Sequence, residues 1–233
     1  PLIVDINDPE APEGGAAGVT DYEALLAEGD PSFAGVMPTD EWDPIALNYT
    51  SGTTGDPKGV VPSHRGTYLM SLLQLTDWAV PRAPVYLWTL PMFHANGWCF
   101  TWAITAAAGT HVCLRKVTGK AVFAAIAEHG VDHFCAAPTV MAMLASAPPQ
   151  ERRSLPRPVR VLTAGSAPPA AILQVISEMG FDVDHVYGIT EASGTPVSCP
   201  RQPEWDALPP AERARLQARQ GVRAAALEEL IVA

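Results

Sequence analysis

Small hydroxyl side chains, glycines and one lysine are concentrated in a single stretch of the chain. Residues 49–59 read YTSGTTGDPKG. The glycines let backbone N–H groups approach an anion closely, the hydroxyls can donate hydrogen bonds, and Lys58 adds a point charge suited to phosphate. The stretch is not a Walker A loop, because that motif places Gly-Lys-Ser/Thr five residues after its first glycine, where this chain has Pro57. It therefore predicts a phosphate-binding loop, since an ordinary turn needs only one or two such residues.

Three later stretches carry side chains suited to a nucleotide and a second substrate. They read LPMFHANGW at residues 90–98, TAGSAP at 163–168 and VYGITE at 186–191. The first surrounds a histidine with apolar side chains, which suits the wall of a pocket. The second holds a glycine whose backbone can lie against a flat base, although it is also an ordinary connection from a strand to a helix.

Single residues in these stretches have both a chemical and a structural interpretation. Tyr187, at a predicted strand end, offers an aromatic face to a purine, or it caps the core. Glu191 is a hard oxygen ligand for Mg²⁺, or an acid favoured by a helix N-terminus. Thr190 can donate to a phosphate oxygen, and His94 either gates a pocket or is a buried histidine with satisfied hydrogen bonds. The combination with Gly188 favours the ligand-binding interpretation of Tyr187.

The elements that position these stretches follow from hydrophobic periodicity. Strands are predicted over 45–49, 59–62, 85–90, 110–114, 131–136, 159–163 and 183–187, and helices over 21–28, 63–78, 97–108, 120–129, 138–146, 169–179 and 209–220. The alternation predicts an α/β fold with a mostly parallel sheet flanked by helices. Pro62 lacks a backbone N–H, so the strand that it ends should be short or at an edge.

Three regions are expected along the chain. Residues 1–43 form an acidic lead-in segment with one short helix, and residues 44–200 form an α/β region that binds nucleotide and acyl group. Residues 201–233 form a charged helix and, from 230 onward, the start of a truncated strand. The chain has no initiator methionine, so we expect it to begin partway through a protein or to have been processed.

Charge and composition exclude several classes of protein. The 233 residues are 48% hydrophobic and 17% charged, which excludes a disordered chain. The net charge of −10 comes from the first 57 residues, which hold 12 acids and no lysine or arginine. No basic stripe marks a nucleic-acid binder, and no apolar run is long enough to span a membrane. The four cysteines form no CxxC pair, so we expect reduced core thiols in a cytoplasmic protein, with neither disulfides nor zinc.

In this order, the four motifs resemble those of the adenylate-forming (AMP-binding) enzymes: acyl-CoA and aryl-CoA ligases, luciferases and adenylation domains of peptide synthetases. The resemblance runs from about residue 43 to residue 233. It implies that the chain is an internal part of the large N-terminal domain. The ribose-binding aspartate, the hinge and the mobile C-terminal domain with its catalytic lysine would then lie outside it.

The resemblance also implies roles for individual residues. Thr190, Glu191 and His94 would be catalytic, and Glu191 would hold Mg²⁺. The pocket for the acid would include Phe93, His94, Asn96, Gly97 and Trp98. The residues that would bind ATP are Thr50, Ser51, Gly52, Thr53, Thr54, Gly55, Lys58, Gly165, Ser166, Ala167, Pro168, Tyr187 and Gly188.

His94 bears on the class of acid. In the peptide-synthetase branch, the corresponding motif carries an aspartate that pairs with the α-ammonium of an amino acid. An imidazole cannot anchor an ammonium, so an amino-acid substrate is disfavoured. Residues 93–98 look most like the short- and medium-chain acyl group, which includes methylthiopropionate ligases and plant acyl-activating enzymes.

The implied activity is that of an AMP-forming acyl-CoA ligase of fatty acid metabolism, with ATP, Mg²⁺ and coenzyme A. The expected partners are a small carboxylic acid, ATP and CoA; a homodimer is left open, and no nucleic acid is expected. By itself the chain is expected to be inactive. Two alternatives stay open at this point. The chain could be a non-catalytic fragment that binds nucleotide or nothing, or the acyl group could pass to a carrier-protein thiol or to oxygen.

Overall fold

The computed structural model describes residues 2–9, 17–51 and 55–231. Contacts between residues divide the chain into two compact units, Pro1–Thr39 and Asp40–Ala233. This boundary lies close to the expected end of the acidic segment at residue 43, while the functions assigned to the three regions stay predictions.

The first unit contains a two-stranded parallel sheet that the sequence pattern did not indicate. Its strands are β1 (Val4–Asp5) and β2 (Thr20–Asp21). The helix α1 (Tyr22–Ala27) follows directly, and the Asp21 carboxylate caps it by accepting a hydrogen bond from the backbone N–H of Ala24 at 2.9 Å.

The described part of the second unit is built on one seven-stranded sheet with the order β11-β10-β9-β8-β7-β5-β6. The strands from β9 to β6 run parallel, and β10 and β11 add an antiparallel edge. In chain order the elements are β3 (Asn48–Tyr49), β4 (Gly59–Val60), α2 (His64–Asp77), β5 (Val85–Trp88), α3 (Ala95–Trp98), α4 (Phe100–Ala106), β6 (Thr110–Cys113), α5 (Gly119–His129), β7 (His133–Ala136), α6 (Pro138–Ala145), β8 (Val159–Thr163), α7 (Ala170–Glu178), β9 (Phe181–Tyr187), β10 (Val197–Cys199), α8 (Pro210–Gln217) and β11 (Val222–Arg223), with short 3-10 helices η1 (Pro149–Glu151), η2 (Thr190–Ala192) and η3 (Pro203–Ala207). The α/β fold with a mostly parallel sheet is confirmed.

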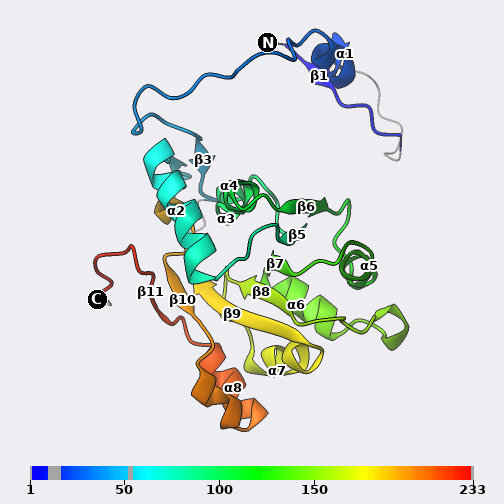
Figure 1. Ribbon diagram of the computed structural model, residues 1–233, viewed down its shortest axis with the longest axis vertical. Helices are drawn as coiled ribbons and strands as arrows, with labels where there is room; N and C mark the ends of the chain where they lie inside the picture. Colours follow the sequence, from blue (N-terminus) through cyan, green and yellow to red (C-terminus); the bar gives the residue numbers. More distant parts are fainter. Residues whose placement is uncertain (1, 10–16, 52–54, 232–233) are drawn as a thin grey trace. The chain divides into compact units, whose positions relative to one another are not determined.

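Two apolar cores cover the two faces of this sheet. Helices α5, α6 and α7 pack on one face around Phe123, Phe134 and Ile176, and α8 contributes Ala214 to the same core. The other face is covered by α2 and α4, and Trp78 at the end of α2 packs with Phe100 of α4 and Tyr86 of β5. Figure 1 shows α2 and α4 on one side of the sheet and α6, α7 and α8 on the other. With both faces buried, the central strands are apolar nearly throughout, as is typical of parallel sheets.

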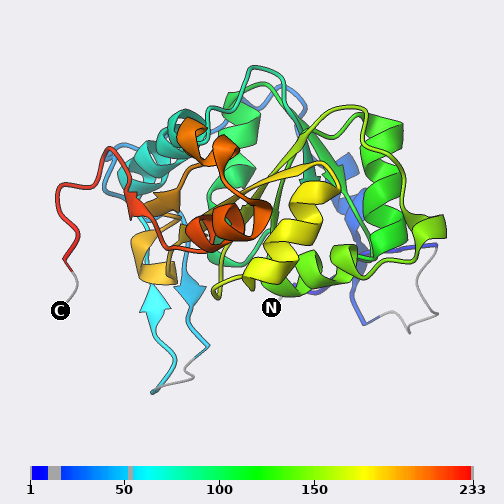
Figure 2. The ribbon, with the colours of Figure 1, turned by 90° about the horizontal axis from the view of Figure 1, so that it is seen from below.

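The connection pattern creates a switch point in the sheet. After β5 the chain passes to β6 on one side, and it then returns to β7 on the other side of β5. In open α/β sheets, ligands bind beyond the carboxyl ends of the strands at such a point. The antiparallel hairpin of β3 and β4, which Figure 2 shows extending away from the sheet and its helices, carries the predicted phosphate loop. Its second strand is short and ends before Pro62, as expected.

Three predictions about local structure are wrong. The helix expected over 97–108 is broken at Cys99, whose φ of 66° separates α3 from α4. Leu230 and Ile231 belong to no strand, and the rest of that predicted strand lies outside the described residues. The sequence pattern also missed β10 and β11, because strands of two or three residues are too short to show periodicity.

The cysteines follow the prediction of core thiols with one exception. Cys99, Cys135 and Cys199 are free and buried, whereas Cys113 is free and exposed at the end of β6. Within the described ranges, no helix is both long enough and apolar enough to cross a bilayer.

Candidate active site

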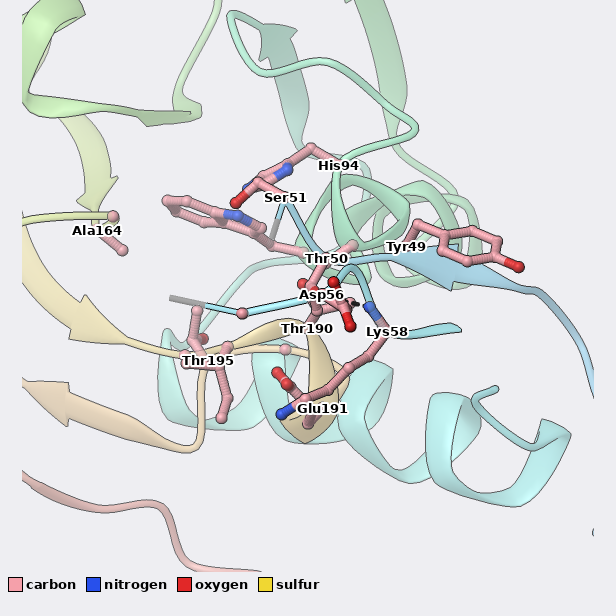
Figure 3. Close-up of a pocket in the computed structure, with 17 residues that line it drawn as sticks. Tyr49, Thr50, Ser51, Asp56, Lys58, His94, Ala164, Thr190, Glu191 and Thr195 are labelled. Carbon is pink, nitrogen blue, oxygen red and sulfur yellow. Dashed lines mark hydrogen bonds between the residues drawn. The ribbon is translucent and has the colours of Figure 1, made fainter. Parts of the chain in front are cut away.

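A cavity of about 740 Å³ lies where the hairpin and the carboxyl ends of the parallel strands meet. Figure 3 shows its lining residues, which come from segments distant in the sequence. They are Tyr49, Thr50, Ser51, Gly55, Asp56, Lys58, His94, Ala95, Trp98, Ala164, Gly165, Gly188, Ile189, Thr190, Glu191, Gly194 and Thr195. All four predicted motifs therefore contribute to one cavity at the position that the sheet topology favours.

Hydrogen bonds between its two ends close the phosphate loop. The backbone N–H of Thr50 donates to the carbonyl of Lys58, and the backbone N–H of Lys58 donates to Oγ1 of Thr50, each at 3.0 Å. Thr50 therefore fixes the loop ends, while Ser51, Gly55 and Lys58 also line the cavity. The predicted ligands Gly52, Thr53 and Thr54 lie outside the described residues.

Thr190 and Glu191 form η2 directly after β9, and both line the cavity. The segment folds back tightly, because a Cβ on Gly188 would lie 1.9 Å from the carbonyl oxygen of Gly194. Only glycine can occupy this position while the segment keeps its path. In Figure 3 Thr190 and Glu191 lie near Asp56 and Lys58 of the hairpin. The four side chains group one hydroxyl, two carboxylates and one ammonium around the same space.

The segment after His94 is a left-handed turn. The φ angles of Ala95, Asn96, Gly97, Trp98 and Cys99 are 40°, 47°, 61°, 55° and 66°. Left-handed backbone is costly for residues that have a Cβ, so five such residues in a row need strong support from their surroundings.

That support comes from three neighbouring segments. Nδ2 of Asn48 donates to Oδ1 of Asn96 at 2.6 Å, Oγ1 of Thr101 donates to the Asn96 carbonyl at 3.1 Å, and the Cys99 thiol donates to the Ser193 carbonyl at 2.8 Å. The turn directs His94, Ala95 and Trp98 into the lining of the cavity. Asn96 and Gly97, which we predicted to contact the acid, lie in the turn itself and not in this lining.

Gly97 lets the turn pack tightly against the sheet. Its φ is +61°, and a Cβ built there would lie 2.6 Å from Cζ3 of Trp88. Glycine is therefore required both by conformation and by contact. The wall that Trp98 forms depends on this close approach of the turn to β5.

Of the other predicted ligands, only Gly165 belongs to the described lining of the cavity. Gly165, with a φ of +93°, lines it beside Ala164. Tyr187 is the last residue of β9 and is 44% exposed, and Phe93 is 80% exposed. Neither belongs to the lining, and the same holds for the remainder of the adenine-loop prediction, Ser166, Ala167 and Pro168.

The lining side chains carry more negative than positive charge, so they would repel a triphosphate that has no bound cation. Lys58 is the only lysine or arginine among these lining residues, all of them described, whereas Asp56 and Glu191 are carboxylates. One ammonium cannot neutralise a polyphosphate beside two carboxylates. A divalent cation that is shared between a carboxylate and phosphate oxygens would fit this donor set, since Mg²⁺ takes one or two carboxylates together with substrate oxygens.

Sequence reasoning missed several lining residues. Tyr49, Asp56, Ala95, Ala164 and Ile189 are immediate neighbours of predicted ligands. Gly194 and Thr195 come from a separate Ser-Gly-Thr sequence just after the glutamate motif. The similarity of that sequence to the small residues of the phosphate loop was the one signal that could have indicated them.

Comparisons with known proteins agree with this geometry. The model of the family described as AMP-binding enzyme matches residues 5–228. Over its whole length the chain is 53% identical to acetate–CoA ligase CCL3 of Humulus lupulus and 48% identical to the peroxisomal acetate/butyrate–CoA ligase AAE7 of Arabidopsis thaliana. It covers 42% of each, so it spans about two fifths of the length of these relatives.

A solved structure shares the fold. O-succinylbenzoate coenzyme A synthetase (MenE) from Bacillus subtilis, in complex with AMP, matches with a TM-score of 0.70 and 25% identity over 88% of this chain and 50% of that chain. The fold is therefore shared with a protein whose structure was solved in complex with AMP.

Proposed function

Because the chain belongs to the family of AMP-binding enzymes, we propose that it forms the ATP- and acid-binding part of an ATP-dependent acyl-CoA ligase. The observation that carries the proposal is the single cavity shared by the phosphate hairpin, the turn after His94, Gly165, and the pair Thr190 and Glu191. Relatives named as acetate and acetate/butyrate ligases support it.

In the first step, a carboxylate oxygen of the acid attacks the α-phosphorus of ATP. A P–O bond forms, the bond to the bridging oxygen breaks, and pyrophosphate leaves with its electron pair. Lys58 and the N–H and hydroxyl groups of the loop hold the β- and γ-phosphates. Thr190 donates to the α-phosphate, and His94 lies beside the carboxylate. The protein acts by positioning and by neutralising charge that develops on oxygen.

Glu191 is the residue that would hold Mg²⁺. Its carboxylate lines the cavity near Lys58 of the hairpin, where one lysine cannot balance a polyphosphate. When bound there, the cation would supply positive charge to the phosphate oxygens. Glu191 keeps the polyphosphate in register with Thr190, which precedes it in η2.

In the second step, the CoA thiolate attacks the acyl carbon, and AMP leaves from the tetrahedral intermediate. The names of the relatives support CoA as acceptor.

The acid is a short- or medium-chain carboxylate of fatty acid metabolism. His94 cannot anchor an ammonium group, which disfavours amino acids. Trp98 closes one side of the cavity with a large ring, and Ala95 and Ala164 leave only small apolar surfaces. These walls suit a short alkyl group better than a polar side chain.

Acid-dependent exchange of pyrophosphate into ATP tests the proposal. The complete reading frame that contains this chain should catalyse exchange with acetate, propionate or butyrate, and not with glycine or alanine. Addition of CoA should then give the acyl-CoA thioester, whereas transfer only to a pantetheine carrier would identify the alternative acceptor. If none of these acids supports exchange, acid activation is refuted, and the motifs would bind nucleotide for another purpose.

The location and assembly are also part of the proposal. Free cysteines favour a reducing compartment, which we take to be the cytoplasm. The proposal also includes assembly of the protein as a homodimer. Two relatives from Arabidopsis thaliana are named as peroxisomal. Cell fractionation and light scattering of the purified protein test the two points separately.

A further inference from the structure

Helix α2 buries polar side chains on the face that it turns toward the site. Thr67, Ser71 and Gln74 are each only 3–4% exposed and recur at helical spacing. Helices normally bury an apolar stripe, and buried polar groups cost free energy unless they are hydrogen-bonded. Ser71 is satisfied within the helix, since its hydroxyl donates to the carbonyl of Thr67 at 2.7 Å.

Gln74 forms its hydrogen bonds outside the helix. Its Nε2 donates to Oγ1 of Thr195 at 2.6 Å and to the carbonyl of Trp98 at 3.4 Å. Oγ1 of Thr195 lies 3.0 Å from Oε1 of Gln74 and can donate to it. One buried amide thus joins the left-handed turn after β5 to the segment after β9.

Both partners of Gln74 line the cavity, whereas Gln74 does not. Trp98 and Thr195 are 8% and 7% exposed, and each contributes to the lining of this cavity. The Cys99 thiol makes a second link between the same two segments, to the carbonyl of Ser193. Gln74 of α2, which lies outside the lining, therefore sets the distance between the walls formed by Trp98 and Thr195.

We propose that Gln74 is a positioning residue that holds Trp98 and Thr195 at the spacing required by the carboxylic acid. The inference rests on the proposed function, because the acid is the ligand expected between these walls. The amide of Gln74 donates to Trp98 and Thr195, and the main chain of Lys58 is held by Thr50, so loss of Gln74 should affect the acid more than ATP.

Steady-state exchange kinetics of the complete reading frame test this selectivity. Gln74→Met keeps the length and volume of the side chain but removes both the donor and the acceptor. We expect KM for the acid to rise about ten-fold and KM for ATP to stay within about two-fold. Gln174→Met on α7 is the matched control, because the amide of Gln174 donates only to Glu178 in its own helix. It should leave both constants unchanged.

Thr195→Val removes the same link from the other side and is nearly isosteric. It should also raise KM for the acid, and the double variant should be no worse than the poorer single variant, since both changes break one interaction. This second variant decides the question if Gln74→Met fails to fold. Additive effects of the two changes would overturn the proposal.

Thiol labelling of Cys99 provides a readout that does not depend on activity. Burial raises the pKa of the Cys99 thiol to about 12 and keeps it unreactive. Gln74→Met should speed alkylation of Cys99 about ten-fold, as quantified by mass spectrometry of its peptide. Cys135, which is fully buried in the sheet, should keep its rate, and exposed Cys113 reports that the reagent is active.

The two readouts separate the two hypotheses. If the wild type catalyses no exchange but Gln74→Met still speeds the labelling of Cys99, the ligase proposal is refuted and Gln74 is retained as the link between the walls. Exchange in the wild type, with unchanged kinetics and labelling in Gln74→Met, would refute the role of Gln74. An equal loss for acid and ATP would also refute it, because it would indicate a general structural role.

Discussion

The indole Nε1 of Trp88 donates a hydrogen bond to Nδ1 of His111, with 2.9 Å between the nitrogens. The residues lie on the neighbouring strands β5 and β6, and their rings stack with centroids 5.8 Å apart. Only an unprotonated Nδ1 can accept this bond, so His111 is neutral here. Since Trp88 packs against Gly97, His111 supports the turn that carries Trp98.

Protonation of His111 should therefore destabilise the fold. Burial lowers the pKa of His111 below its usual 6.5, so the unfolded chain binds more protons once the pH falls through that value. The free energy of unfolding should be highest above about pH 6.5, fall with decreasing pH, and level off below the folded-state pKa. His111→Phe keeps an aromatic ring that cannot titrate. Urea titrations at about pH 7.5 and pH 5 should show a smaller loss of stability in this variant than in the wild type. An identical loss would contradict the assignment.

Asp184 should show the opposite dependence. Burial, and then the nearby Asp182, raises the pKa of Asp184 to about 6, although Arg160 partly offsets this. The folded state then binds more protons than the unfolded state, so this contribution is greatest below about pH 4 and is lost as the pH rises through about 6. Asp184→Asn cannot ionise and should be more stable than the wild type at pH 7 by about 2 kcal/mol or less. Glu178→Gln, on the exposed face of α7, should change little. Lower stability of Asp184→Asn would mean that the Arg160 ion pair dominates.

Sequence reasoning predicted most of the α/β body because local periodicity and burial agree there. The strand 159–163 was predicted with its observed bounds, and α5 and α6 within one residue at each end. The site residues were predicted from the four motifs and their resemblance to a known family. Motifs placed just after predicted strands come together once the strands are parallel, and ten of the predicted residues line the cavity: Thr50, Ser51, Gly55, Lys58, His94, Trp98, Gly165, Gly188, Thr190 and Glu191.

The features that sequence reasoning missed depend on contacts between distant segments. The left-handed turn after His94 contains Ala, Asn and Trp, and nothing local predicts five positive φ angles in such a sequence. It is held by Asn48 and Ser193, which lie far away in the chain. Likewise, Gln74 and Thr195 are separated by 121 positions, and helical periodicity identifies the first only as a polar residue on α2.

Lys58 should supply much of the affinity for the triphosphate. It is the only lysine or arginine in the described lining, and a hydrogen bond to a charged group contributes about 1.5–3 kcal/mol. Lys58→Ala should weaken binding of MgATP about ten- to a hundred-fold in isothermal titration calorimetry. Lys120→Ala removes an equal charge from the exposed start of α5 and should leave the affinity unchanged. Equal affinities in the two variants would exclude the hairpin from binding.

Glu191 should make nucleotide binding depend on the metal. Glu191→Gln keeps the size of the side chain but removes the charge that would attract Mg²⁺. We expect ATP affinity in the presence of Mg²⁺ to fall about ten-fold, while affinity in EDTA stays the same or rises, because the carboxylate no longer repels the phosphates. Calorimetry with and without Mg²⁺ measures both quantities. Glu178→Gln is the control. An equal loss in both conditions would mean that Glu191 acts on the fold and not on a cation.

Gly97 should be among the least replaceable residues of the turn, for two reasons that can be separated. A φ of +61° penalises any side chain by about 1 kcal/mol, and a Cβ at 2.6 Å from the Trp88 ring adds overlap of about 1–3 kcal/mol. Gly130, which ends α5, has a φ of +65°, and a Cβ added there would meet no atom within 4 Å, so alanine at this position incurs only the first penalty. Urea unfolding should therefore show a loss of about 1 kcal/mol for Gly130→Ala and about 2–4 kcal/mol for Gly97→Ala. The difference between the two losses of stability measures how firmly Trp88 of β5 holds the turn. If the two variants lose equal stability, Trp88 can move aside, and the turn is held by its hydrogen bonds to Asn48 and Ser193 instead.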